Sequence, residues 1–252
     1  MKTRRIAKIL IVGGLLVLAY AAAVLFWRDP ATDLYNRYQQ DRLESALEQE
    51  FASWDATRPT GEEEEASRSA AARTAARADA ARDARRFLAS LEPGQAFGRI
   101  EIPRIDLDAI VVHGTRWRAD LSRGPGHYER TTVPGLGKTV GVAGHRTTFG
   151  APFRNIDDIR VGDAITLEMP YATFRYRVFA HEIVESDDWS VIRNRGFDTI
   201  MLSACHPLYS ADQRWIVYGR LVEVRPRGGT AYHLAQVFQA RARCSPSSCI
   251  RD

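Results

Sequence analysis

The sequence has little cysteine and little excess charge. Three of its 252 residues are cysteines, and 35 basic residues against 31 acidic ones leave a formal net charge of +4. A surface that binds nucleic acid concentrates positive charge, whereas the basic residues here are scattered among acidic ones. The composition therefore argues against a nucleic-acid partner. Because 45% of the residues are apolar, the chain is long enough for one domain with extensions.

Long apolar runs are scarce as well, and the one that stands out extends from Ile9 to Trp27. As a helix with a rise of about 1.5 Å per residue, this run spans roughly the hydrocarbon core of a membrane. The alternative is a cleaved signal peptide, which predicts a shorter run and a polar start after the small residues at 19–21. Residues 22–27 are still apolar, so the pattern favours an uncleaved anchor over residues 9–27.

A basic segment precedes this anchor. Residues 1–8 contain four basic side chains, namely Lys2, Arg4, Arg5 and Lys8. Positive charge marks the cytoplasmic end of a transmembrane helix, so the pattern predicts that the N-terminus lies inside and the bulk of the chain outside. We therefore expect a single-pass protein of the cell membrane with an extracellular main domain.

Residues 28–92 do not have the pattern of the main domain. Helical spacing of large apolar residues predicts an amphipathic helix from Asp33 to Trp54, which packs on the main domain or, alternatively, lies on the membrane or covers the active site. From Ala66 to Ala89 the chain is rich in Ala and Arg and has almost no large apolar residue before Phe87. This composition predicts a helical or partly disordered spacer that holds the domain off the membrane.

Short strands and turns begin at Glu92-Pro93-Gly94 and continue to residue 226. Apolar or alternating segments between turn residues predict about seven or eight strands. The segments that we expect to form them include Phe97–Pro103, Ala109–His113, Lys138–His145, Ala164–Glu168, Phe174–Val184, Thr199–Cys205 and Arg214–Val224. Their number and spacing are typical of a mainly β domain that forms a barrel, which we place at residues 93–226.

Three reactive or charged residues stand at the ends of these strands. Cys205 ends its strand just before Pro207, which cannot donate to a sheet ladder. A short loop leads to the strand that Arg214 opens, so pairing as a hairpin places Cys205 and Arg214 opposite each other. Upstream, a Gly-His-Arg sequence delivers His145 at another strand end. Cysteine, histidine and arginine together are the parts of a thiol acyl-transfer site.

The three side chains suit three catalytic roles. A thiolate is the nucleophile, and a free cysteine is mostly protonated at neutral pH, so His145 is expected to take the proton of Cys205 and later protonate the leaving amine. Arg214 stays charged and suits an oxyanion. Each residue type alone is more often structural, and only their combination predicts catalysis. His206 follows Cys205 directly and points to the other face of the strand, so it is the weaker base.

The order and context of these residues resemble the sortase family of cysteine transpeptidases. The resemblance covers roughly Phe97 to Val224, and the segments Gly144–Phe153 and Cys205-His206-Pro207 are most similar to class E sortases. It implies a closed barrel of about eight strands. The family usually has Thr-Leu-any-Thr-Cys at the nucleophile, and here Met201 and Ala204 replace both threonines. Substrate contacts that depend on those hydroxyls are therefore not carried over.

The resemblance also implies an activity and partners. It implies cleavage of a Leu-Pro-any-Thr-Gly or Leu-Ala-any-Thr-Gly type sorting signal between Thr and Gly, and transfer to an amine of the cell wall or of a pilin. Candidate substrate contacts are Ser203, Ala204, His127 and Thr147. Neither a cofactor nor a metal is expected. Two alternatives stay open, a thiol hydrolase that releases the acyl group to water and a catalytically silent, membrane-tethered binding protein.

Residues 227–252 form the expected C-terminal tail. The stretch from Tyr232 to Ala242 predicts one amphipathic helix. Cys244 and Cys249 follow, and in an oxidising exterior they could close a small disulfide loop. A metal site is the weaker alternative, because no histidine pair stands near them at ligand spacing.

Overall fold

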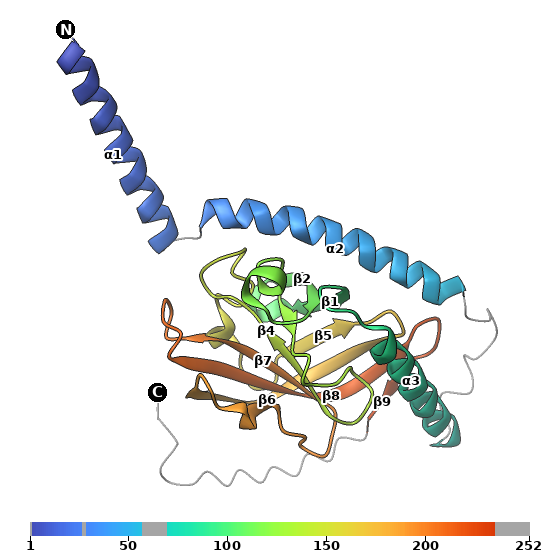
Figure 1. Cartoon of the computed structure of the whole chain (residues 1–252). Coiled ribbons are helices and arrows are strands. Elements are labelled where there is room, and N and C mark those ends of the chain that lie inside the picture. Colours follow the sequence, from blue (N-terminus) through green and yellow to red (C-terminus); the bar gives the residue numbers. More distant parts are fainter. Residues whose placement is uncertain (1, 27–28, 57–69, 235–252) are drawn as a thin grey trace, which may run out of the picture.

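The protein is built on a closed β-barrel, and its helices lie outside the barrel (Figure 1). The computed structural model describes residues 2–26, 29–56 and 70–234. The helices are α1 (Lys2–Phe26), α2 (Pro30–Ala56) and α3 (Ala70–Ser90), with short helical turns η2 (Pro103–Ile105), η3 (Trp117–Leu121), η4 (Ile156–Asp158) and η5 (Trp189–Ile192). The strands are β1 (Ala96–Ile102), β2 (Leu107–His113), β3 (Gly126–His127), β4 (Thr139–Ala143), β5 (Ala164–Glu168), β6 (Ala172–Glu185), β7 (Thr199–His206), β8 (Gln213–Pro226) and β9 (Tyr232–His233).

Strand pairing closes the sheet into a ring. Neighbouring strands follow the order β6-β5-β1-β2-β3-β4-β7-β8-β9, and β6 also pairs with β8. The first eight strands of that order therefore form a closed barrel, and β9 adds to the free edge at the end of β8. Closure removes the exposed edges that an open sheet would present. The prediction of a mainly β protein with a barrel of about eight strands is confirmed.

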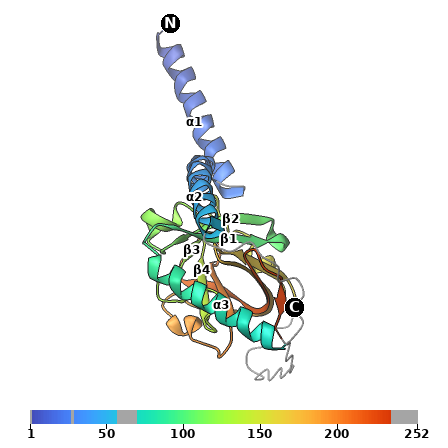
Figure 2. The same ribbon diagram turned by 90° about the vertical axis from the view of Figure 1, so that its right-hand side faces the viewer.

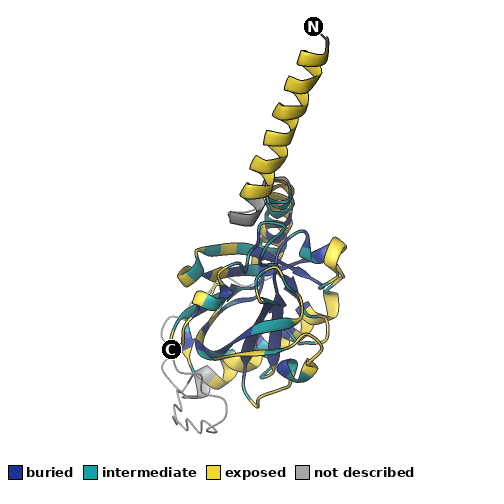
Figure 3. Cartoon of the chain, turned by 90° about the vertical axis from the view of Figure 1, so that its left-hand side faces the viewer, coloured by how far each residue is buried: buried dark blue, intermediate teal, exposed yellow. Residues whose placement is uncertain are grey.

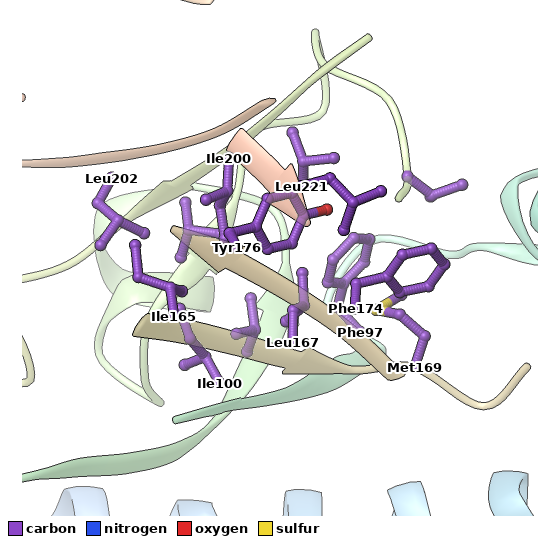
Figure 4. Close-up of a cluster of buried hydrophobic side chains, with 14 of the residues drawn as sticks. Phe97, Ile100, Ile165, Leu167, Met169, Phe174, Tyr176, Ile200, Leu202 and Leu221 are labelled. Carbon is purple, nitrogen blue, oxygen red and sulfur yellow. The ribbon is translucent and has the colours of Figure 1, made fainter. Parts of the chain in front are cut away.

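The barrel is filled by apolar side chains from alternate strand positions. Along β6, buried and more exposed residues alternate from Ala172 to Val178, as a period of two predicts. Figure 4 shows Phe97 and Ile100 of β1 together with Phe174 and Tyr176 of β6 in one cluster, and all four are fully buried. Burial of each large side chain contributes about 1.5–3 kcal/mol to stability. The interior is thus a packed core, and the functional surfaces lie outside it.

Helix α2 packs along β1 and β2. Leu43 and Leu47 are buried in a cluster with Ile110 and Val112. Gln40 completes the contact, because its amide accepts a hydrogen bond from Ile110 N at 2.7 Å and donates to Ile110 O at 3.1 Å. The helix therefore satisfies backbone groups of β2 and covers one side of the barrel, as the first of the two interpretations of its amphipathic pattern predicts.

Helix α3 confirms the helical character predicted for this segment, but it docks on the barrel and is not wholly solvated. It runs across one end of the barrel (Figure 2), with Ala80, Ala84 and Phe87 buried. The ring of Phe87 lies 5.6 Å from that of Tyr171 and 6.1 Å from that of Phe97, measured between centroids. Alanine lacks bulk, so the helix backbone approaches the core closely and one phenylalanine suffices to dock it.

Helix α1 extends away from the barrel and is exposed along the described part of its length (Figure 3). Its segment Thr3–Ala23 is long and apolar enough to cross a membrane. An apolar helix whose described side chains are almost all exposed is the structure that a bilayer accommodates.

The tail departs from its expected helix at its start. Tyr232 and His233 form β9, which pairs with Glu223 and Val224 of β8, and the Tyr232 ring is buried in the main core. The sheet therefore extends past the expected domain end at residue 226. The remainder of the expected helix, as well as Cys244 and Cys249, lies outside the described residues.

Candidate active site

Cys205 and Arg214 are cross-strand partners on the outer wall of the barrel. Strands β7 and β8 run antiparallel, and their register places Cys205 directly opposite Arg214. The neighbouring Leu202 and Ala204 pack into the barrel interior, so the alternation of the strand turns Cys205 to the outer face. The predicted hairpin therefore delivers both side chains to one side of the sheet.

His145 reaches the same place from a parallel strand. Strand β4 pairs in parallel with β7, with Ala143 opposite Ser203. Gly144 N donates to Ser203 O at 3.0 Å and continues this register. His145 follows Ala143 by two residues, and Cys205 follows Ser203 by two residues. The two therefore stand at the same level of neighbouring chain segments. Gly144 is required here, because a Cβ atom would lie 2.6 Å from the ring of Phe153.

A groove of about 550 Å³ joins the three candidate catalytic residues. It lies against the ends of β4, β7 and β8 and under the loop that contains η3. Its lining includes His145, Cys205 and Arg214 together with three of the four expected substrate contacts, Thr147, Ser203 and Ala204. The sequence therefore predicted six residues that the fold gathers around one groove. Within the described ranges, no cluster of histidine, cysteine and carboxylate side chains could hold a metal ion.

His127 is not at this groove. It is fully buried, and its ring stacks on that of Phe97 at a centroid distance of 4.0 Å. Its Nδ1 lies 2.9 Å from Nδ1 of His113, and its Nε2 lies 2.9 Å from Thr132 O. Burial lowers the pKa of His127 to about 3. This side chain is part of the core, so the expectation that His127 contacts the substrate is wrong.

The surroundings of His145 keep its imidazole neutral. Burial lowers the pKa of this histidine below its ordinary value. Its Nε2 is buried and has no hydrogen-bond partner among the described residues. The ring lies beside Phe149, with 5.6 Å between the centroids. A neutral imidazole with an unoccupied nitrogen is able to accept a proton from a thiol.

Two arginines stand near the groove, and they differ in their hydrogen-bond partners. Arg214 donates from Nη1 to Ala211 O at 2.8 Å and to Gln213 O at 2.9 Å. Its Nε and Nη2 make no hydrogen bond to any described residue. Arg146 is 5% exposed and its Nη2 lies 2.7 Å from the carboxylate of Asp157. Arg146 is thus held in a structural ion pair, whereas Arg214 keeps free donors at the groove.

The side chains adjacent to Cys205 have structural positions. His206 turns to the opposite face, where its ring lies 5.5 Å from that of Trp215. Met201 is fully buried in a cluster with Ile216 and Tyr218, and Ala204 is packed in the main core. The two replaced threonines therefore correspond to buried positions, where apolar side chains avoid the cost of an unpaired hydroxyl.

The sequence interpretation missed two aromatic side chains of the groove. Trp117 and Tyr209 line it and remain 54% and 53% exposed. Both lie in turn-rich loops that follow strand ends, and large aromatic residues in such loops are a signal for binding surfaces.

Comparisons with known proteins identify the relatives of this chain. The sequence profile of the sortase domain matches residues 100–222. Sortase D of Bacillus subtilis is 34% identical over 135 residues, which are 52% of this chain and 66% of that protein. Sortase SrtE1 of Streptomyces coelicolor is 29% identical over 240 residues, covering 89% of this chain and 58% of that protein. The chain thus spans less than two thirds of the length of each of these curated relatives.

Solved structures have the same fold. The crystal structure of sortase E1 from Streptomyces coelicolor with a tripeptide in the active site gives a TM-score of 0.51 at 31% identity, covering 55% of this chain and 94% of that one. The sortase SrtF of Corynebacterium diphtheriae gives 0.51 at 29% identity, covering 54% and 89%. The chain belongs to the sortase family of cysteine transpeptidases, and among its members it is similar to the class E sortases.

Proposed function

We propose that this protein is a membrane-anchored transpeptidase that joins secreted proteins to an amine acceptor. The observation that carries the proposal is that Cys205, His145 and Arg214 come from three strand ends and line one groove. The family to which the chain belongs supports it, because a sortase needs a thiol nucleophile, a proton carrier and an oxyanion donor.

The first half of the reaction forms a thioester. Sγ of Cys205 attacks the Thr carbonyl carbon of a sorting signal of the Leu-Pro-any-Thr-Gly or Leu-Ala-any-Thr-Gly type, and the thiol proton passes to His145. The free donors of Arg214 stabilise the oxyanion of the tetrahedral intermediate. The Thr–Gly bond then breaks, and His145 returns the proton to the departing glycine amine.

The second half transfers the acyl group. An amine of a cell-wall precursor or of a pilin attacks the thioester carbonyl and gives its proton to His145. The carbon–sulfur bond breaks, the thiolate takes the proton back, and a new amide bond is formed. The exposed rings of Trp117 and Tyr209 offer apolar surface for the substrates in the groove that contains Cys205.

The proposed location is the cell membrane, with the catalytic domain on the outer side. The apolar segment Thr3–Ala23 in helix α1 supports a single span, and the four basic residues before Ile9 support an inside N-terminus. We further propose a basic segment at 1–8, an anchor at 9–27, a spacer at 28–92, and a catalytic domain that begins at 93 and includes β9 beyond the expected end at 226, with the tail after it.

A product assay tests the proposed activity. The full chain in detergent is incubated with a fluorogenic sorting-signal peptide, with and without a soluble amine such as triglycine. We expect a ligated product that forms only with the amine present. Release of free acid alone would indicate a hydrolase, and failure of a thiol-reactive peptide analogue to label Cys205 would indicate a catalytically silent protein.

Cysteine variants assign the nucleophile in the same assay. We expect Cys205→Ala to abolish thioester formation and leave the fold intact, because a small apolar side chain suits a strand end. The double variant Cys244→Ser/Cys249→Ser serves as the matched control and should retain activity. Activity retained in Cys205→Ala and lost in the tail double variant would reverse the assignment.

A further inference from the structure

Phe149 lies between helix α2 and the ring of His145. Its own ring is half-buried and lies 5.6 Å from His145 and 6.4 Å from Tyr35 of α2, measured between centroids. The Phe149 N–H donates a hydrogen bond of 3.0 Å to Oγ1 of Thr32, in the first turn of α2. One residue of the loop after β4 therefore touches both the candidate base and the helix that follows the apolar segment.

The loop fits closely against the helix. A Cβ atom on Gly150 would lie 2.4 Å from Oδ1 of Asn36, so glycine leaves room for the Asn36 side chain of α2 against the loop. Phe149 and Ala151 both have left-handed φ values, 52° and 43°. A non-glycine residue in this conformation is strained and persists only where its surroundings hold it. The contacts with α2 supply such surroundings for Phe149.

His145 has no hydrogen bond of its own that fixes its ring. Neither of its nitrogens bonds to a described residue, and Nε2 is buried. In catalytic histidines a hydrogen bond to the second nitrogen commonly sets the orientation of the ring. Packing must therefore do so here, and Phe149 is the aromatic ring that lies against the imidazole.

We propose that the first turns of α2 complete the active site, with Thr32 and Phe149 as positioning residues that hold His145 for the transpeptidation. This inference rests on the proposed function. Thr32 fixes the Phe149 backbone, and the Phe149 ring fixes the imidazole next to Cys205 and shields it from water. The helix next to the membrane segment is thereby coupled to the chemistry, although its residues do not line the groove.

The proposal predicts a specific division of kinetic effects. Phe149 does not line the groove, but its ring lies 6.2 Å from that of Trp117, which does. Its loss should therefore lower kcat more than it raises KM, because misplacement of a catalytic group by about 1 Å costs up to 10²-fold. We expect Phe149→Ala to lower kcat by about 10- to 100-fold. Phe149→Tyr keeps the ring and should restore most of the rate.

A pair of variants tests the Thr32 hydroxyl, which accepts from Phe149 N–H and also donates to Asp29 O at 3.3 Å. Thr32→Val removes the acceptor oxygen at nearly constant volume, and we expect kcat to fall by about three- to tenfold, since a net hydrogen bond contributes about 0.5–1.5 kcal/mol. Thr32→Ser retains the oxygen and should stay near the unmodified protein. The control is Ser45→Ala, whose hydroxyl donates only to Asp41 O within the same helix. All variants are measured as full chains in detergent.

Titration of His145 gives a readout that does not require activity. With ¹³C-labelled histidine, the imidazole of the full chain is followed by NMR against pH, and its assignment comes from the His145→Gln spectrum. Phe149→Ala admits water to the ring, so we expect the pKa of His145 to rise toward its ordinary value of about 6.5. Phe149→Tyr should leave it unchanged.

The outcomes separate this inference from the proposed function. If the unmodified chain transfers no acyl group but Phe149→Ala raises the pKa of His145, the positioning stands and the function fails. An unchanged pKa with unchanged kcat in Phe149→Ala overturns the positioning alone. Equal losses in Thr32→Val and Ser45→Ala reduce the contact to general helix stability, and faster turnover in Thr32→Val would show that the contact restrains the site.

Discussion

Cys205 and Arg214 face each other as register partners across the antiparallel strands β7 and β8, on the outer wall of the barrel. The backbone itself therefore fixes the spacing between the candidate nucleophile and the candidate oxyanion donor. Nη1 of Arg214 is held by two carbonyl groups of its own loop, which leaves Nε and Nη2 to meet a substrate. A pre-organised donor of this kind costs no reorganisation when charge develops.

Replacement of Arg214 should therefore act on turnover. A guanidinium that meets the developing oxyanion contributes more in the transition state than in the ground state, so Arg214→Ala should mainly lower kcat, by about 10²–10³-fold. Arg214→Lys keeps the charge but loses the planar fork, so it should restore activity only in part. Steady-state kinetics on a fluorogenic sorting-signal peptide measure both.

Arg220 supplies the matched control on the same strand. It shares the face of Arg214 but lies six residues, or roughly 20 Å, along an extended chain. Its guanidinium sits over the ring of Phe197 at 4.3 Å. Arg220→Ala should leave kcat unchanged. Activity of Arg214→Ala near that of Arg220→Ala would require another oxyanion donor, and the ion pair of Arg146 with Asp157 would have to open to provide one.

The strands and the main polar residues of the groove were predictable because both depend on local signals. Alternation along β6 and the apolar run of β7 reflect burial on one or both faces, which is a property of the strand itself. Proline after Cys205 and glycine before His145 mark where strands end. Because β7 and β8 form a hairpin, Cys205 and Arg214 must pair across it. The spacing of the two residues in the sequence was therefore enough to predict that they lie opposite each other.

The errors concern contacts between segments far apart in the chain. His127 lies in a glycine- and proline-rich stretch that reads as a surface turn, yet parallel pairing with β2 draws it beside His113 in the core. The alanines of α3 carry no hydrophobic pattern, because a close helix contact needs small residues. Thr32 and Phe149 meet across 117 residues, and neither carries a local signal for that contact.

The orientation of the anchor makes a separate prediction. In the proposed orientation the basic residues before Ile9 lie inside, which puts the barrel outside with its groove accessible to secreted proteins. Protease added to intact, wall-stripped cells should remove the catalytic domain, as detected by an antibody to the barrel. A cytoplasmic protein in the same cells serves as the control for lysis. Protection of the barrel until the cells are lysed would contradict this orientation.

The buried pair of His113 and His127 predicts loss of stability in acid. His127 Nε2 donates to Thr132 O, so its Nδ1 accepts the hydrogen from Nδ1 of His113, and burial lowers the pKa of both rings, that of His127 to about 3. Below about pH 6.5 the unfolded chain binds protons that the folded chain excludes, so stability falls by up to about 1.4 kcal/mol per pH unit for each ring. The thermal midpoint of the full chain in detergent should therefore fall between pH 7 and 4.5.

Two histidine variants test the origin of this fall. In His127→Phe the fall of the thermal midpoint should be shallower, whereas replacement of the exposed His233 by Asn should not change it. Equal slopes in all three proteins would show that the pair does not titrate as described.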